Sequence, residues 1–295
     1  MKGTGHSVAR ILTPASRSLG EFDVRRTLPD RNQQRVGPFI FFDHMGPADF
    51  SPGSGVNVRP HPHIGLATIT YLFAGAIRHR DSLGFDQLIR PGDVNWMTAG
   101  RGVVHSERTP ESLKRSGSHL HGIQAWIALP TESEEIEPDF VHYAADTIPR
   151  IDLSGASLKV IAGNAYGGVS PVRTASETLY VEADLEKDAT LQLPEGVDEI
   201  GVYVVDGAVD IGGNTLSPGR MAVLAESATA SLDASMQSKC MLLGGKRLNG
   251  ERHIWWNFVS SSRRRIEQAK NDWRDGRFDS VPGDPEFIPL PGSNR

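Results

Sequence analysis

The sequence predicts an all-β protein made of two β-barrel domains and a short C-terminal helix. Short runs rich in β-branched and aromatic residues alternate with glycine and proline turns along most of the 295 residues. A second copy of this strand-and-turn pattern follows the first. A helical pattern appears only near 263–274, where Gly276 closes it.

The first copy supplies strands in close succession. "ATITYLFAG" (67–75) has the composition of a strand and ends in a glycine turn, and "AIRHRDSLG" (76–84) follows as the return strand of a hairpin. The segment 85–107 adds two strands separated by the turn signal "PGD", and "GIQAWIALP" (122–130) adds another. Many short strands with this turn spacing indicate a barrel or a sandwich.

The second copy repeats the order of the first. "IGVYVVDGAVDIGGNTLSPGRMAVLAE" (200–226) again contains an apolar run, Gly-Ala, a return strand, leucine and Pro-Gly. The acidic, proline-bearing segment 129–151 between the copies reads as a linker. We therefore expect an N-terminal domain at 1–145, a C-terminal domain at 146–250 and a tail with the helix at 251–295.

Composition excludes several function classes. The net charge of −5 gives no general attraction for nucleic acid, and we interpret the basic segment "SRRRIEQAKNDWR" (262–274) as a solvated helix face. No stretch approaches the about 20 apolar residues of a membrane span, and the N-terminus lacks a signal-type apolar region. The single cysteine, Cys240, lies in the apolar run "CMLLGG" and reads as a buried hydrophobe. We expect a cytoplasmic protein in a reducing compartment.

Two short clusters hold four side chains that suit a metal ion. "HPH" begins at His61 and "HSE" begins at His105. Alternate residues of a strand point to one face, so His61 and His63 would share a face, as would His105 and Glu107. Two such strands lining a barrel would converge three imidazoles and one carboxylate. These donors suit Fe, Mn, Co, Ni, Cu or Zn better than Mg or Ca, and they leave coordination positions open.

A single H-x-H pair is weak support for a metal site, because most such histidines are at the surface or hydrogen-bonded to other polar groups. The second pair at matching spacing, within an all-β chain, favours the metal interpretation. The prolines at 60 and 62 alternate with the histidines, which predicts that this strand lies at the mouth or the edge of a sheet.

The neighbourhood of these clusters resembles a known family, the pirin family of bicupins, across about residues 36–130. The matching segments are "FDHMGPADF" (42–50), "RPHPHIGLATITYLFAGAIRHRDSLG" (59–84), "IRPGDVNWMTAGRGVVHSE" (89–107) and "LHGIQAWIALP" (120–130). The second half fits the family only in outline, as its metal-free copy. The resemblance implies two cupin-type (jelly-roll) barrels in one chain.

The resemblance also implies a single mononuclear iron in the N-terminal barrel. Its ligand positions fall on His61, His63, His105 and Glu107, all of which are intact. One departure concerns Ala67, which stands where the family usually has a glutamate four residues after the second histidine. We expect this loss to spare the metal and to alter the pocket.

The function that the resemblance implies is a dioxygenase that opens flavonols in the manner of quercetin 2,3-dioxygenase, with O₂. Fe(2+) is the expected metal, with Mn, Ni, Co, Cu or Zn as alternatives, and Glu107 is both ligand and candidate general base. Trp96 and Trp126 could line a pocket for a small planar aromatic substrate, or be plain core.

One alternative is a non-enzymatic regulatory protein that senses metal redox state as a transcription co-regulator or enzyme modulator. Another is a cupin that binds metal without turnover. We expect a monomer, because a bicupin supplies both barrels.

Other polar residues near the clusters have two interpretations. His44, His119 and His121 either support the metal ligands or are strand histidines bonded to backbone. Asp43 either orients an imidazole or caps a turn, and the cap is the preferred interpretation. His79 stands between two arginines on the return strand, which predicts that it is exposed.

Overall fold

The computed structural model describes residues 7–18, 20, 22–226 and 228–292, which form mainly β-structure in two compact units. The C-terminal unit comprises the described residues of Met1–Ala15, Arg25–Phe42 and Asp146–Leu248, and the N-terminal unit those of Ser16–Val24, Asp43–Ala145 and Asn249–Arg295. Each unit is therefore discontinuous in sequence, and the expected domain ranges stay a prediction.

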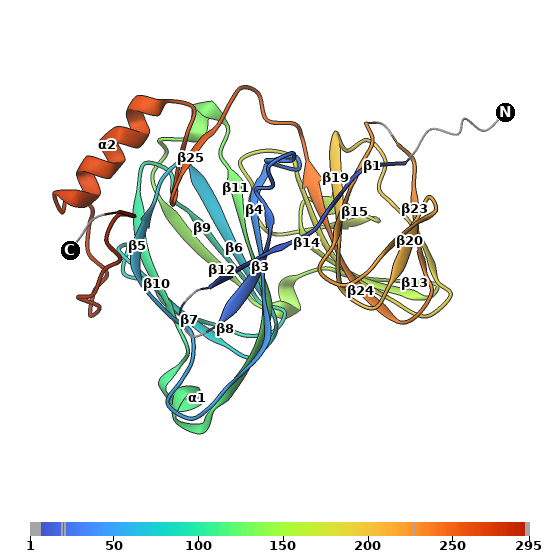
Figure 1. Cartoon of the computed structure of the whole chain (residues 1–295), viewed down its shortest axis with the longest axis horizontal. Helices are drawn as coiled ribbons and strands as arrows, with labels where there is room; N and C mark the ends of the chain where they lie inside the picture. Colours follow the sequence, from blue (N-terminus) through green and yellow to red (C-terminus); the bar gives the residue numbers. More distant parts are fainter. Residues whose placement is uncertain (1–6, 19, 21, 227, 293–295) are drawn as a thin grey trace. The chain divides into compact units, whose positions relative to one another are not determined.

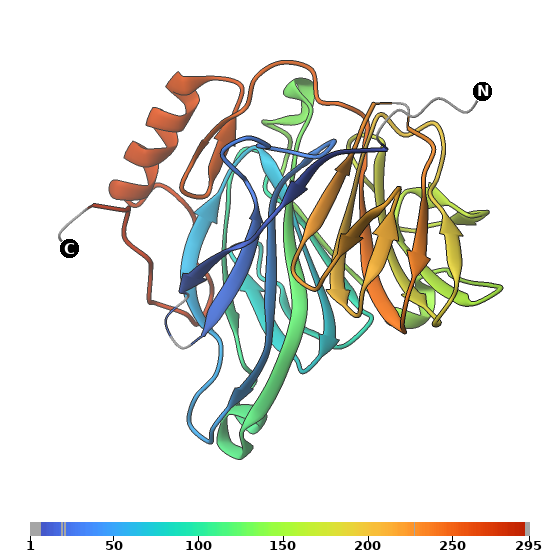
Figure 2. The ribbon, with the colours of Figure 1, turned by 45° about the vertical axis from the view of Figure 1, so that its right-hand side comes forward.

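The N-terminal unit contains most residues of two sheets (Figure 1), although Ala15, Arg25–Leu28 and Phe39–Phe42 of the larger sheet group with the C-terminal unit. The larger has the order β12 (Asp139–Tyr143), β9 (Val94–Thr98), β6 (Leu66–Ala74), β11 (Ser118–Ala128), β4 (Phe39–Phe50), β3 (Asp23–Leu28) and β2 (Ala15–Ser18). The smaller has the order β5 (Asn57–His63), β10 (Val103–Arg108), β7 (Ile77–Asp81) and β8 (Asp86–Ile89). Helix α1 (Glu111–Ser116) lies beside the loop that follows β4 (Figure 2), where Gly53 N donates to Lys114 O at 2.7 Å.

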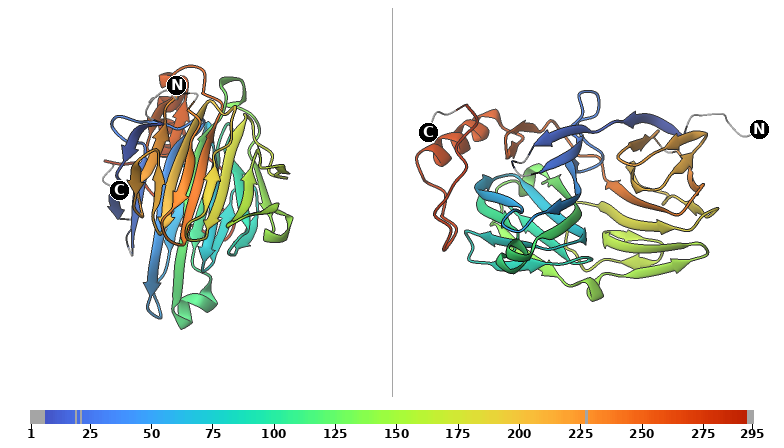
Figure 3. Two further views of the ribbon diagram at one scale, coloured as in Figure 1. Left: turned by 90° about the vertical axis from the view of Figure 1, so that its right-hand side faces the viewer. Right: turned by 60° about the horizontal axis from the view of Figure 1, so that its bottom comes forward.

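The C-terminal unit repeats this plan, with one sheet of seven strands and one of four. The larger has the order β1 (Val8–Leu12), β22 (Met221–Leu224), β19 (Glu199–Asp206), β24 (Ser238–Gly245), β17 (Thr178–Leu185), β14 (Ala156–Ala162) and β13 (Arg150–Leu153). The smaller has the order β18 (Thr190–Gln192), β23 (Ser231–Ala234), β20 (Val209–Ile211) and β21 (Asn214–Leu216). In each unit the strands surround an interior (Figure 3), so the all-β prediction with an internal repeat is confirmed.

The interior of the C-terminal unit is apolar. Its buried cluster consists of aliphatic side chains together with Cys240, which is fully buried on β24 as the sequence predicts. The short hairpin β15 (Asn164–Ala165) and β16 (Gly168–Val169) also belongs to this unit. Along the chain, short 3-10 turns lie between β11 and β12, at Thr131–Ser133, and between β12 and β13, at Ala145–Thr147.

The C-terminal tail folds back on the N-terminal unit beside β5 (Figure 1). It contains the hairpin β25 (His253–Trp255) and β26 (Phe258–Ser260), and helix α2 (Arg263–Arg274). Ile266 and Ala269 of α2 are buried with Ile64, while Arg263 and Arg264 are exposed to solvent, as a solvated helix face requires. No helix in the described ranges is both long enough and apolar enough to cross a membrane.

Candidate metal centre

β5 carries the first two histidines along the edge of the four-stranded sheet. The strand pairs with β10 alone within that sheet, so the prolines at 60 and 62 remove no ladder hydrogen bond from a central strand. This confirms the edge position that the prolines predict. On the open side, Ile288 N of the tail donates to Pro60 O at 2.8 Å, which fixes the backbone next to His61.

Pairing between β5 and β10 brings the two sequence clusters together. His61 lies directly opposite His105, and the ring centroids of these two residues are 4.4 Å apart. His63 is 5.0 Å from each of the other two rings. One nitrogen from each of the three rings lies within 4.8 Å of the others, so the three could share one metal ion.

Burial keeps these imidazoles in the form that binds metals. Desolvation lowers the pKa of His63 and of His105 well below the usual histidine range, and it also lowers the pKa of His61. For His61 the Arg59 carbonyl and the Glu107 carboxylate oppose the effect of burial. Neutral rings carry the lone pair that a metal requires.

The three rings differ in how their nitrogens are hydrogen-bonded. His61 Nδ1 contacts Arg59 O at 2.8 Å, and the ring of His63 bonds to the Asn257 backbone. His105 Nδ1 contacts His79 Nδ1 at 3.3 Å. His63 Nδ1 and His105 Nε2 are buried and have no partner within the described part of the chain. Because buried polar nitrogens rarely stay unpaired, the residues present fit a bound metal ion.

Glu107 lies near the histidines but outside the group of nitrogens that are close enough to share an ion. Its carboxylate accepts hydrogen bonds from Gln124 Nε2 at 2.8 Å to both oxygens and from Thr70 Oγ1 at 3.3 Å. Sequence reasoning missed Gln124 and Thr70. The available signal was that each is a polar residue flanked by apolar residues, and β6 and β11 place the two directly opposite each other.

Strand register separates the two tryptophans. Trp126 is paired with Thr68, two residues from Thr70, so it shares the face of β6 and β11 that contacts Glu107. Its ring meets His63 edge-on at 5.1 Å. Trp96 is paired with Ile69 and therefore lies on the opposite face of the sheet, where it is buried. Of the two tryptophans, only Trp126 lies next to one of the three histidines, and it is buried there.

Ala67 also lies on the face of β6 away from Glu107, because it is an odd number of residues from Thr70. It is fully buried and paired with Thr98 and Ile127. A side chain at this position therefore points away from Glu107, and the effect of the missing glutamate on the pocket stays a prediction.

His79 is buried, with 3% of its surface exposed, so the prediction that it is exposed is wrong. β7 alternates buried and exposed side chains, and His79 faces inward with Asp81 while the flanking arginines face outward. Its Nε2 lies 2.9 Å from Asp81 Oδ2, and its ring stacks on Phe140 with centroids 4.3 Å apart.

The remaining histidines near the motifs lie apart from this group. His44 and His121 stack on each other, with their Nε2 atoms 2.7 Å apart, and Phe73 packs against both rings. His119 is half exposed and contacts Asp49 at 2.7 Å. Asp43 is buried on β4.

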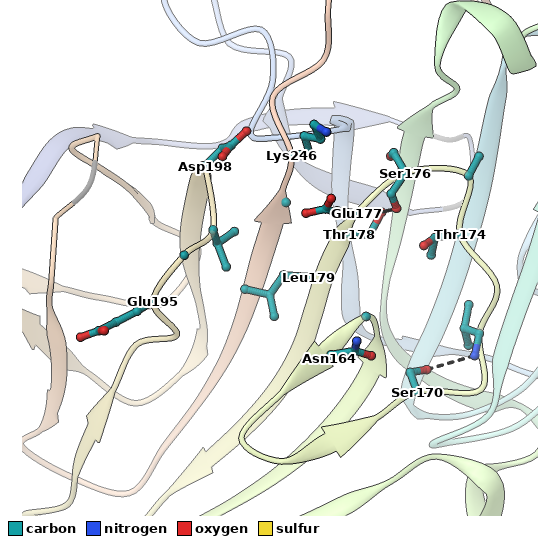
Figure 4. Close-up of a pocket in the computed structure, with 16 residues that line it drawn as sticks. Asn164, Ser170, Thr174, Ser176, Glu177, Thr178, Leu179, Glu195, Asp198 and Lys246 are labelled. Atoms are coloured by element: carbon teal, nitrogen blue, oxygen red, sulfur yellow. Dashed lines mark hydrogen bonds between the residues drawn. The ribbon is translucent and has the colours of Figure 1, made fainter.

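A cavity of ≈ 590 Å³ opens in the C-terminal unit (Figure 4). Its labelled side chains include the carboxylates Glu177, Glu195 and Asp198 together with Lys246 and several hydroxyl groups. Over the described residues, the histidine trio is the single group of three potential ligands close enough to share an ion, and it lies in the N-terminal unit.

Comparison with known proteins agrees with this architecture. The family model described as Pirin matches residues 21–127, and that of the Pirin C-terminal cupin domain matches residues 180–279. A "Pirin-like protein" of Caulobacter vibrioides is 49% identical over 93% of this chain and 96% of its own length.

Solved structures show the same fold. A quercetin 2,3-dioxygenase from Acinetobacter baumannii has a TM-score of 0.89 at 32% identity, covering 97% of each chain. A bacterial pirin from Escherichia coli, solved in complex with nickel(II), has a TM-score of 0.65 at 22% identity, covering 81% of this chain and 99% of its own. The fold, the paired cupin domains and the sequence matches together show that this chain belongs to the pirin family.

Proposed function

We propose that this protein is a metal-dependent dioxygenase that cleaves a small planar aromatic substrate of the flavonol class, such as quercetin, with O₂. The observation that carries the proposal is the buried trio of His61, His63 and His105, with two nitrogens that lack partners within the described residues. The similarity to a solved quercetin 2,3-dioxygenase at 32% identity supports the reaction class.

The proposed metal ligands are His61, His63, His105 and Glu107. Fe(2+) is the proposed metal, although Mn, Ni, Co, Cu and Zn accept the same donors. When bound, the metal would supply Lewis-acid chemistry that lowers the pKa of a substrate hydroxyl group. Thr70 and Gln124 both donate to Glu107 Oε1, whereas Oε2 accepts, among the described residues, from Gln124 alone and keeps a lone pair for a metal.

The protein side chains have separate roles in this proposal. Glu107 accepts the proton of the substrate hydroxyl as a general base. Gln124 and Thr70 orient its carboxylate, since both donate hydrogen bonds to it. Trp126 presents a flat apolar surface next to His63, of the kind that binds aromatic rings.

Glu107→Gln tests the role of the carboxylate. Glutamine keeps an oxygen donor but loses the charge and the basicity, so turnover of quercetin should fall by about 10²-fold or more in protein with verified iron content. The measurement follows loss of the visible absorbance of quercetin together with O₂ uptake. Glu137→Gln makes the same chemical change at an exposed side chain and should leave turnover unchanged.

Wild-type protein that holds iron but consumes no O₂ with any flavonol would overturn the dioxygenase proposal. The regulatory alternative, in which the metal state controls binding to another protein, would then replace it. If Glu107→Gln turns over quercetin as fast as the wild type, Glu107 is not the general base, but the protein can still be a dioxygenase.

A further inference from the structure

The buried pair His79 and Asp81 stands directly behind His105, one of the four proposed ligands. His105 Nδ1 is 3.3 Å from His79 Nδ1, and His79 Nε2 is 2.9 Å from Asp81 Oδ2. All three residues are at most 3% exposed. The pairing of β7 with β10 accounts for this placement, because Asp81 lies opposite His105 in the ladder.

The hydrogen bonds of this chain determine which ring nitrogens carry protons. Asp81 Oδ1 accepts from the backbone N–H groups of Leu83 and Phe85, at 3.0 and 3.1 Å, so the carboxylate is held in place by the turn after β7. Its second oxygen, a carboxylate acceptor, is 2.9 Å from His79 Nε2, and a His79 ring that carries its one proton on Nε2 has an acceptor at Nδ1. His105 Nδ1 then donates, and His105 Nε2 keeps its lone pair.

The resulting free nitrogen is the one that the metal centre needs. His105 Nε2 is buried and has no partner within the described residues. The opposite tautomer of His105 would place a proton on Nε2, and that proton would block metal binding. Stacking on Phe140, with rings 14° from parallel, fixes the plane of His79 and therefore the direction in which its Nδ1 points.

His105 differs from the other two histidines in the nature of its partner. His61 contacts the carbonyl of Arg59, and His63 bonds to the backbone of Asn257. Main-chain partners of this kind persist whatever side chain is present. The partner of His105 is a side chain that is itself oriented by a second side chain, so this support can be removed by substitution.

We propose that His79 and Asp81 are positioning residues that hold His105 in its metal-binding tautomer and orientation and thereby set how tightly the centre retains its metal. This inference rests on the proposed metal site. Neither residue needs to contact the metal or the substrate. Groups that hydrogen-bond to metal ligands commonly change metal affinity by about 10- to 100-fold when they are removed.

The test is the affinity of the metal-free, full-length protein for Co(II), measured by competition with a chelator and by the visible spectrum of the bound ion. His79→Phe keeps a ring of similar size on Phe140 but removes the acceptor, and Asp81→Asn removes the charge that fixes His79. Each should weaken Co(II) binding by about 10- to 100-fold and change the spectrum. His79→Gln restores an acceptor and should recover part of the affinity.

Arg78→Ala is the matched control, since Arg78 neighbours His79 on β7 but pairs with the exposed Asp86. It should bind Co(II) as the wild type does. Thermal unfolding of each metal-free variant separates positioning from stability, because a purely structural role would lower the midpoint without changing the affinity of the folded protein. If His79→Phe does not fold, Asp81→Asn and His79→Gln still decide the outcome.

Two results would overturn the inference in distinguishable ways. If wild-type protein binds no Co(II), the proposed metal site fails and this inference fails with it. If the wild type binds Co(II) and folded His79→Phe and Asp81→Asn bind it within about threefold of the wild type, the metal site stands and the positioning role is wrong.

Discussion

The two units share a plan of one seven-stranded and one four-stranded sheet, but they fill the interior differently. The C-terminal unit encloses side chains such as Leu158, Val181 and Leu242, all fully buried. The N-terminal unit has an apolar cluster of its own, but it also buries imidazoles and a carboxylate, and the half-buried amide of Gln124 bonds to that carboxylate. The comparison teaches that the scaffold alone does not make a metal centre, since the chemistry depends on which side chains the inward positions carry.

The largest expected effect comes from removing two of the histidines that distinguish the N-terminal unit. His61→Ala with His105→Ala should abolish metal binding by the chain, because two of the three clustered imidazoles are lost. The fold should survive, since apolar burial supplies most of the stability. Elemental analysis with circular dichroism checks both expectations.

A control for this double variant is His119→Ala with His253→Ala, which removes two histidines outside the trio. It should retain the metal content of the wild type. If His61→Ala with His105→Ala retains its full metal content, or if the wild-type chain binds two metals, metal binding is not confined to the three histidines of the N-terminal unit.

The second prediction concerns the apolar interior. Leu242→Ala should lower the free energy of unfolding of the C-terminal unit by about 2–5 kcal/mol, because it leaves a cavity in a fully buried core. The metal content of the folded protein should not change. Urea unfolding measures the free energy of unfolding, and elemental analysis measures the metal content. Loss of metal from folded Leu242→Ala would show that metal binding depends on the apolar interior of the C-terminal unit.

The third prediction follows from the lowered histidine pKa values. An unfolded histidine has a pKa near 6.5, whereas burial lowers the pKa of His63 and of His105 in the folded state. Below about pH 6.5 the unfolded chain therefore binds more protons, so the free energy of unfolding falls as the pH falls toward the lowered values. Above that pH the two rings are neutral in both states, so they no longer change the free energy of unfolding with pH.

Urea unfolding of the metal-free protein between pH 7.5 and pH 5 measures this dependence. His63→Gln with His105→Gln should flatten it, by up to about 1.4 kcal/mol per pH unit for each histidine removed. A slope equal to that of the wild type would mean that these rings are not buried in the neutral form. Since residues 155–250 contain no histidine, the C-terminal unit supplies no such contribution there.

The smallest expected effect concerns Cys240 in the apolar interior. Burial raises the pKa of this thiol to about 12, so almost none of it is thiolate at pH 8. Modification by a thiol reagent such as dithionitrobenzoate should be slow in the native protein and fast in urea. Equal rates under the two conditions would show that the core of the C-terminal unit is open to solvent.

Sequence patterns predicted much of this molecule because their signals are local. The alternation of His61 with His63 and of His105 with Glu107 indicated two strands with their ligands on one face, and the prolines indicated an edge. The repeated order of strands and turns predicted the two similar units. Each of these signals lies within a few residues of the feature that it predicts.

The features that were missed depend on contacts between distant strands. Gln124 reaches Glu107 only because β11 pairs with β6 in one particular register. β1 joins β22, more than 200 residues away, and the expected range 1–145 gave no sign of this. His79 was misread for a different reason, since its arginine neighbours suggested exposure although strand alternation places it inside.

The most direct test of the account is X-ray diffraction at the iron absorption edge from crystals of the iron-loaded protein. We predict one anomalous peak per chain, within bonding distance of His61, His63 and His105, and no peak in the C-terminal unit. A peak at any other side chains, or a second peak among the strands of the C-terminal unit, would contradict it.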